Sequence, residues 1–201
     1  MTNKITKLEI KELIINEEPI SGEFDNQTVI DLDDRNVEFN NCFLDKITIN
    51  NSKMIKSSFI DMKINNSDLS NLNCDTSTFI RNEYVSSKLI GTICSSSYLK
   101  DITFENCKMP YFNLSQSKVR NVKFIDCDLS GSSFNYLDFK GLYFQDCNLS
   151  EVEFIGTKMH GLDLSSDNIK GIIINKDNLE GLIVNEFQAL EIAKLLGIEI
   201  K

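Results

Sequence analysis

The sequence lacks the features on which most enzymes and membrane proteins depend. It has one histidine and contains no phosphate-binding loop, no glycine-rich dinucleotide turn and no nucleophile elbow. No segment approaches the roughly 20 apolar residues that cross a bilayer. The first residues have neither the apolar core nor the cleavage site of a signal peptide. We therefore expect a cytoplasmic protein without membrane contact, cofactor, metal or catalytic activity.

Positive charge is also scarce. The chain has 21 Lys and Arg residues against 30 Asp and Glu, which gives a formal net charge of −9. A nucleic-acid binder needs cations to neutralise phosphates, so direct binding to nucleic acid is disfavoured. The balance suits a protein partner with a basic surface. The alternative is that the acidic surface only keeps the protein soluble.

A five-residue repeat dominates what is present. Every fifth residue from Phe39 to Val184 is apolar, without a slip of frame. A second inward series, of small or apolar residues, lies two positions earlier. A period of five fits neither the α-helix nor the simple strand. It predicts a chain that turns a corner every five residues. Like residues also recur at a spacing of 20, as in Phe104, Phe124 and Phe144, which predicts four-sided coils of 20 residues.

Several pentads match a known pattern of a small residue, Asp or Asn, Leu or Phe, and two variable positions. Good copies begin at Cys127 (Cys-Asp-Leu-Ser-Gly) and at Cys147 (Cys-Asn-Leu-Ser-Glu). The chain therefore resembles the pentapeptide-repeat family. The resemblance implies an all-β fold, a right-handed quadrilateral β-helix with a short C-terminal α-helix as its cap.

The repeat divides the chain into three parts. Residues 1–36 are expected to form an N-terminal cap with a strand near Leu8 to Ile15, because Asp34 interrupts the apolar series. Residues 37–187 form the β-helix. Residues 186–201 form a helix and a short strand at Ile198 and Ile200, for capping and dimerisation. Asn185 and a Gln three positions later predict a capping box at the start of this helix.

The candidate reactive groups fit structural roles better than chemical ones. All six cysteines fall on inward positions and no Cys-x-x-Cys pair exists, so we expect reduced, metal-free core residues, with metal binding as the alternative. His160 follows an inward position and should face solvent. Asp167 and Asp177 fall on inward positions, where they are expected to bond backbone groups. A functional acid pair is the alternative.

Acidic residues concentrate on one predicted face of the rod. The face that includes Phe104, Phe124 and Phe144 carries nine acids against three lysines, whereas the other faces are mixed or close to neutral. Such an acidic stripe on a rod of duplex-like width predicts a mimic of the field of DNA. The residues expected to bind a partner are Asp45, Glu83, Glu105, Asp126, Asp146 and Asp163.

The C-terminal motifs resemble a narrower group. Gly-Leu-Asp-Leu at 161–164, Phe-Gln-Ala at 187–189 and Leu-Gly-Ile at 196–198 are similar to the ending of Qnr-type quinolone-resistance proteins of Gram-positive bacteria. This resemblance implies binding to the type II topoisomerases DNA gyrase and topoisomerase IV, with modulation or protection from quinolones. It also implies a homodimer through the C-terminal helix, with Phe187, Leu190, Ile192 and Leu195 as interface residues.

Two features keep a second hypothesis open. Several Qnr-type proteins carry projecting loops on which protection depends, and the unbroken frame from Phe39 to Val184 leaves no room for such loops. The acidic stripe can also be incidental. The alternative function is a non-catalytic scaffold that binds another bacterial protein.

Overall fold

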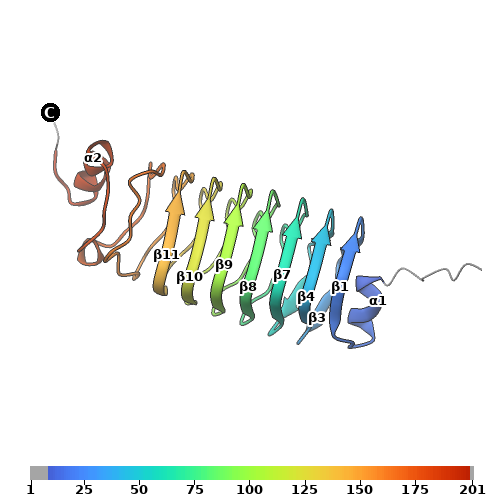
Figure 1. The fold of residues 1–201 in the computed structure, drawn as a ribbon. Helices are drawn as coiled ribbons and strands as arrows, with labels where there is room; N and C mark the ends of the chain where they lie inside the picture. Colours follow the sequence, from blue (N-terminus) through green and yellow to red (C-terminus); the bar gives the residue numbers. More distant parts are fainter. Residues whose placement is uncertain (1–8, 200–201) are drawn as a thin grey trace, which may run out of the picture.

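The computed structural model describes residues 9–199, which form a rod of stacked coils with one short helix at each end (Figure 1). One face carries a seven-stranded parallel sheet in the order β1-β4-β7-β8-β9-β10-β11. Its strands are β1 (Ile20–Asp25), β4 (Glu38–Asp45), β7 (Ser58–Asn65), β8 (Thr78–Val85), β9 (Tyr98–Glu105), β10 (Lys118–Ile125) and β11 (Asp138–Gln145).

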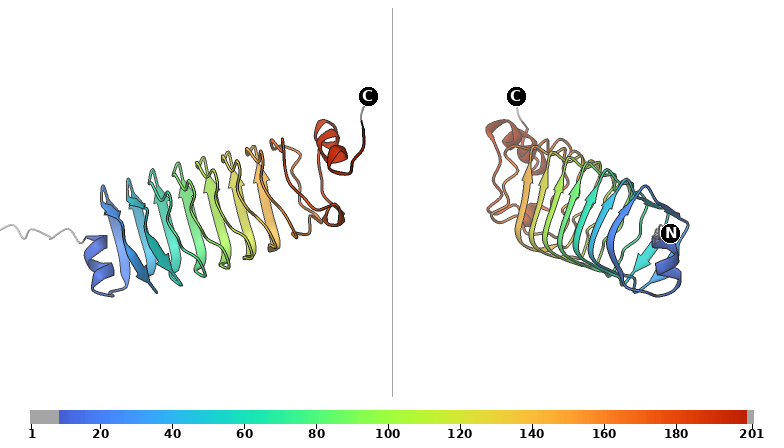
Figure 2. Two further views of the ribbon diagram at one scale, coloured as in Figure 1. Left: turned by 180° about the vertical axis from the view of Figure 1, so that it is seen from behind. Right: turned by 45° about the vertical axis from the view of Figure 1, so that its right-hand side comes forward.

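The remaining faces are held by shorter pairings at the same 20-residue offset. Strand β2 (Thr28–Ile30) pairs in parallel with β5 (Thr48–Asn50), and β3 (Asp33–Arg35) pairs with β6 (Lys53–Ile55). Single parallel bridges, such as Asn148 with Asn168, continue these columns toward the C-terminus. The predicted fold class, a right-handed quadrilateral β-helix closed by a C-terminal helix, is confirmed (Figure 2).

A left-handed residue forms each corner of the coils between Asn26 and Gly161. Each fifth residue from Asn26 to Gly161 has a positive φ, and most of these residues are not glycine. Asn and Asp tolerate this conformation best among residues with a side chain, and Asn is frequent here. Larger residues such as Lys46 (φ 54°) and Tyr111 (φ 60°) also adopt it. The stacked coils therefore impose the corner on residues that would otherwise avoid it.

The core consists of columns of like side chains. The ring centroids of Phe104 and Phe124 lie 4.9 Å apart, and those of Phe124 and Phe144 lie 5.2 Å apart, with nearly parallel planes. Phe134, from another face, meets Phe124 edge-on at 5.9 Å. The predicted phenylalanine column is confirmed, and columns from different faces pack against one another in the interior.

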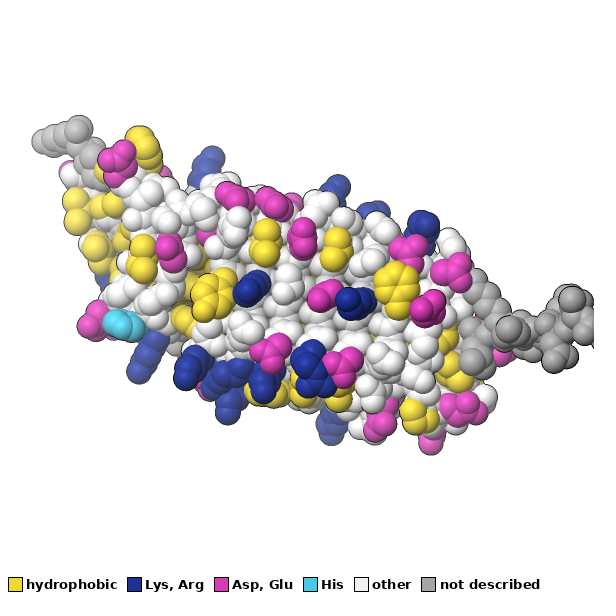
Figure 3. Space-filling model, viewed as in Figure 1, with side chains coloured by type: hydrophobic (Ala, Val, Ile, Leu, Met, Phe, Trp, Pro, Cys, Tyr) yellow, Lys and Arg dark blue, Asp and Glu magenta, His cyan; other side chains and the backbone are white. Residues whose placement is uncertain are grey.

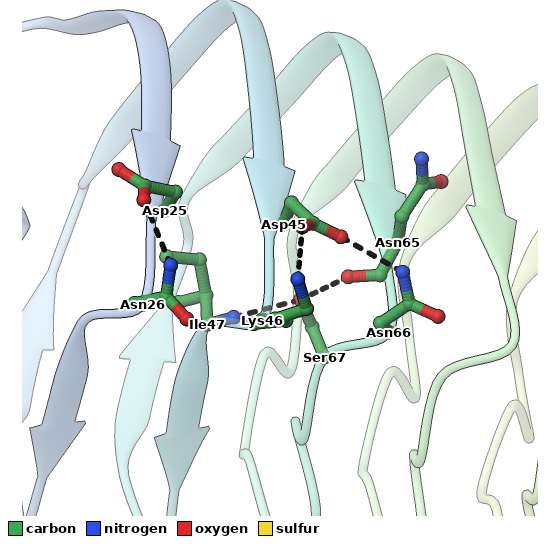
Figure 4. A network of polar contacts seen from close by, with 8 residues as sticks. All are labelled: Asp25, Asn26, Asp45, Lys46, Ile47, Asn65, Asn66 and Ser67. Atoms are coloured by element: carbon green, nitrogen blue, oxygen red, sulfur yellow. Dashed lines mark hydrogen bonds and ion pairs between the residues drawn. The ribbon is translucent and has the colours of Figure 1, made fainter.

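Small polar residues on the second inward series satisfy the backbone at the corners. The amide of Ile47 donates to Oγ of Ser67 in the next coil at 3.0 Å, and this hydroxyl donates to the carbonyl of Asn65 at 2.7 Å (Figure 4). The amides of Ser57 and Ser77 bond serines one coil ahead in the same way. A buried amide without a partner would cost about 1–3 kcal/mol, so these serines stabilise the turn itself.

The N-terminal end differs from the expectation. A strand was predicted near residues 8–15, but α1 (Ile10–Ile15) is a helix that buries Ile10, Leu13 and Ile14 against the first coil. The second and third of these residues follow the first by three and four positions, which is the spacing of one face of a helix. The segment is too short for that pattern to be recognised in the sequence. Coil pairing begins at Ile20, upstream of residue 37. Asp34 interrupts the apolar series without interrupting the pairing, since it still pairs with Met54 in the next coil and its half-buried side chain accepts the amide of Arg35.

The C-terminal end is partly as expected. Helix α2 (Glu186–Leu195) begins with the predicted capping box of Asn185 and Gln188. Asp177, expected inside, is exposed, because a 3-10 helix, η1 (Lys176–Asn178), replaces a corner. The strand predicted at Ile198 is absent from the described part, where that residue is irregular, and Ile200 lies outside the described residues.

The aromatic column yields a test of the fold. Phe124→Ala should lower the free energy of unfolding by about 3–5 kcal/mol, because it opens a cavity between two stacked rings. Urea denaturation measures this loss. Tyr143→Ala, on the exposed side of β11, is the control and should change stability by less than about 1 kcal/mol. Equal losses in both variants would contradict the column as the source of stability.

Candidate functional site

The predicted acidic stripe lies along the ends of the long strands. Asp45 and Glu105 occupy the same row of the sheet, one residue past an inward leucine or phenylalanine. Glu83 lies two residues before this row, on the other side of the inward row. Asp126 and Asp146 form the corner that follows. All but Asp45, which is half-buried, are exposed, as is Asp163. Acidic side chains are visible along the upper margin of the sheet face in Figure 3, where these strands end.

The N-terminal half of the stripe is largely neutralised. Asp45 accepts a hydrogen bond from Asn66 at 2.8 Å and lies 3.3 Å from the Lys46 ammonium (Figure 4). The Asn66 bond and then the neighbouring lysine hold the pKa of Asp45 below its usual value. Glu83 pairs with Lys63 at 3.5 Å. These acids therefore present little net field to a partner.

The C-terminal half of the stripe is not neutralised. Within residues 9–199, Glu105, Asp126, Asp146 and Asp163 make no ion pair with a lysine or arginine. Hydrogen bonds from Ser165, its amide at 2.9 Å among them, lower the pKa of Asp163 and keep it ionised. Negative charge is thus concentrated over the last coils, close to α2.

A row of cations accompanies the stripe and was not singled out in the sequence. Lys100, Arg120 and Lys140 are direct partners in the register of β9, β10 and β11, at the starts of the strands. Figure 3 shows Lys and Arg gathered along the lower margin of that face. Like charges side by side on a sheet are unfavourable. In the sequence, the predicted face that holds these cations contained acids from other rows as well, so its charge looked mixed. The 20-residue spacing of the three cations was the signal that could have revealed the row.

The six cysteines lie in the core, and His160 lies on the surface. All six cysteines are buried and free. Burial raises the pKa of Cys42 to about 11, and burial raises that of Cys74 well above its usual value, so these thiols are protonated at neutral pH. His160 is exposed, and its ring lies over Gly181 of the next coil. No group of three potential metal ligands comes together in residues 9–199.

Asp167 is the one buried carboxyl side chain among the residues that the structure describes. It is 7% exposed, and its Oδ1 accepts the amide of Cys147 at 2.8 Å, the role that serines fill in earlier coils. Its Oδ2 has no hydrogen-bond partner. Burial raises the pKa of Asp167 to about 6. Gln188 of α2 donates to its carbonyl oxygen at 2.6 Å, so the group lies where the helix joins the coils.

The C-terminal helix presents part of the predicted dimer surface. Phe187 is 75% exposed and Leu190 is 48% exposed, whereas Ile192 and Leu195 are partly buried against the core. The four residues thus divide into an outward pair and an inward pair. Two further exposed apolar residues, Leu196 and Ile198, extend the outward surface and were missed because they follow the helix.

Comparisons with known proteins identify the repeat. The family model described as a pentapeptide repeat region matches residues 77–154. No curated protein matches the sequence. None of the helices described is long and apolar enough to cross a membrane.

Solved structures match the chain at low sequence identity. A trypsin-treated form of QnrB1, described as a plasmid-mediated fluoroquinolone resistance protein, is 15% identical, with 90% of this chain and 100% of that chain covered and a TM-score of 0.43. HetL from the cyanobacterium Nostoc, described as involved in regulation of heterocyst differentiation, is 11% identical, with coverages of 87% and 92% and a TM-score of 0.35.

Asp167 gives a pH-dependent prediction. Its pKa is raised on folding, so the folded state takes up a proton as pH falls, and stability is lost as pH rises from about 4 through 6. Asp167→Ser should remove this part of the pH dependence and raise the melting temperature at pH 8. Melting curves between pH 4 and 8 measure it. Asp177→Ser, at an exposed site, is the control; if both variants behaved like the parent, the buried carboxylate would not destabilise the fold.

Proposed function

We propose that this rod is a DNA-mimicking, non-enzymatic ligand of type II topoisomerases. Its residues 77–154 match a pentapeptide repeat region, and the left-handed corners of the β-helix continue before and after that region. The candidate partners are DNA gyrase and topoisomerase IV, which the C-terminal motifs suggest by resemblance to Qnr-type proteins. The proposal implies a cytoplasmic protein. Its alternative is a scaffold for a different protein.

One observation carries the proposal: four carboxylates that have no cationic partner among residues 9–199 follow one side of a straight rod, namely Glu105, Asp126, Asp146 and Asp163. Each coil advances by about 4.8 Å, so the charges are sparser than the one per about 1.7 Å of duplex DNA. Such a rod reproduces the sign and the direction of the DNA field rather than its spacing. A channel lined with lysine and arginine attracts it for the same reason that it attracts DNA.

The unbroken corners bear on what binding does. From Asn26 to Gly161 no coil carries an inserted loop. A rod without projections can fill a DNA channel and has nothing to reach a drug bound deeper in the enzyme. We therefore propose inhibition of supercoiling, with little protection from quinolones.

The charge of the stripe is the first test. Asp126→Lys with Asp146→Lys should weaken inhibition of gyrase supercoiling about tenfold or more, mainly by slowing association, because steering by charge acts on the association rate. Binding by the parent should also weaken steeply with salt, since exposed charges are screened over about 8–10 Å at physiological ionic strength. Both side chains are exposed, so thermal stability should change little.

The matched control is Asp31→Lys with Glu151→Lys. These two acids also occupy left-handed corners, but on a different edge of the rod, and their reversal changes the net charge equally. Equal inhibition by parent and both double variants would eliminate the stripe as the binding surface. Loss of inhibition in both would mean that net charge alone acts.

Dimerisation is the second proposal, and it rests on the apolar surface of α2. Phe187→Ser with Leu190→Ser should convert a dimer into a monomer, because these exposed side chains would bury apolar area between two copies at about 25 cal/mol per Å². Light scattering at micromolar concentration measures the mass. Ile173→Ser, an exposed apolar position outside the helix, should leave the dimer intact. A monomeric parent would refute the proposal.

A further inference from the structure

The long sheet ends before the β-helix does. Strand β11 pairs with β10 on one side and is the last strand of the seven-stranded sheet. The chain one coil later, residues 158–165, runs past it without forming a strand. In Figure 1 this part of the chain follows β11 as an irregular coil that connects to α2. The sheet therefore has an edge in the middle of the rod's C-terminal half.

The missing hydrogen bonds can be assigned from neighbouring coils. In those coils the amide of an inward residue donates to the carbonyl 19 positions later: Leu129 to Asn148 at 2.9 Å, and Phe154 to Ile173 at 2.8 Å. By this rule Phe139 would donate to residue 158 and Phe144 to residue 163. Neither bond is formed, and no backbone hydrogen bond joins residues 138–145 to 158–165, both of which are fully described. The edge of β11 is thus unpaired.

A hollow lies beside the first half of this edge. It has a volume of about 500 Å³ and is lined by Tyr136, Leu137, Asp138, Phe139, Gly156, Lys158 and His160. Phe139 is only partly buried, whereas Val119, its partner on β10, is fully buried. Apolar surface and free backbone groups are therefore open at the same place.

The surroundings of the edge are cationic in a protein with a net charge of −9. Lys118, Lys140 and Lys158 are exposed and make no ion pair within residues 9–199. The Asp138 carboxylate binds Arg120 at 2.8 Å and also faces Lys118 in the register of β10 and β11. This leaves Lys140 and Lys158 without a neighbouring acid in an ion pair among the described residues. Acidic groups from outside would relieve the repulsion among these lysines.

We propose that the edge of β11 is a docking site for an extended, acidic peptide segment of a partner protein. The segment adds a strand to the sheet, as exposed edges commonly accept. Its backbone pairs with the free groups of β11, including the amides of Phe139 and Phe144. An apolar side chain of the segment packs on Phe139 and Tyr136, and its carboxylates contact Lys140 and Lys158. This site is distinct from the acidic stripe and requires no topoisomerase.

The free edge can be tested in the unliganded protein. Amide hydrogen exchange should be much faster at Phe139 and Phe144 than at Val119 and Phe124, which occupy equivalent positions in the paired strand β10. Equal protection at the four amides would mean that the edge is closed and would overturn the proposal.

The ligand class is tested with a fluorescent heptapeptide of alternating glutamate and valine or phenylalanine. It should bind by anisotropy and slow exchange at Phe139 and Phe144. Lys140→Glu with Lys158→Glu should weaken binding at least about tenfold, whereas Lys88→Glu with Lys108→Glu, exposed lysines on another face, should not. N-methylation of alternate peptide amides should abolish binding, because it removes the donors of the added strand.

Three outcomes of the peptide measurements would also overturn the proposal. The first is equal binding by a peptide in which lysine replaces glutamate. The second is unchanged binding by the N-methylated peptide, which would mean that charge alone holds it. The third is binding of a single-stranded oligonucleotide, dependent on the same lysines, with no binding of the glutamate peptide. Gyrase inhibition does not enter these measurements, so their failure leaves the acidic stripe untouched.

Discussion

The left-handed corner at every fifth residue is the constraint on which the rest of the structure depends. Each corner directs the chain from one face of the four-sided coil to the next. It also points the following backbone amide inward, where only the next coil can provide a hydrogen-bond acceptor. Serines such as Ser67 supply that acceptor, and Asp167 does so in one of the last coils. Since each coil satisfies its neighbour, side chains of one kind stack in columns, inside as aromatic rings and outside as rows of charge.

The stacking explains why much of the fold was predictable. A period of five with a superperiod of 20 specifies the inward columns, and Phe104, Phe124 and Phe144 stack as expected. The ends were less predictable, because one helical turn such as α1 is too short to display a period, and η1 removes a corner without changing the sequence frame that had placed Asp177 inside. Whether the chain forms a left-handed corner or a 3-10 helix at such a position depends on its contacts with the neighbouring coil.

The surface features were likewise predictable only in part. The acidic residues could be sorted to one face from the repeat, but their neutralisation by Lys46 and Lys63 depends on side-chain geometry that spacing does not specify. The open edge of β11 leaves no trace in the apolar period, because Phe139 and Phe144 still occupy inward positions. Acidic and basic residues thus lie on a single sheet, the acids at the ends of the strands and the cations of β9, β10 and β11 near their starts.

The central claim is that the acidic stripe takes the place of DNA on a type II topoisomerase. Its most direct test is competition, with gyrase bound to a fluorescently labelled duplex and titrated with the protein while anisotropy is recorded. The account predicts release of the duplex at low salt and progressively less release as salt increases. A complex that retains the duplex while the protein is bound would contradict it.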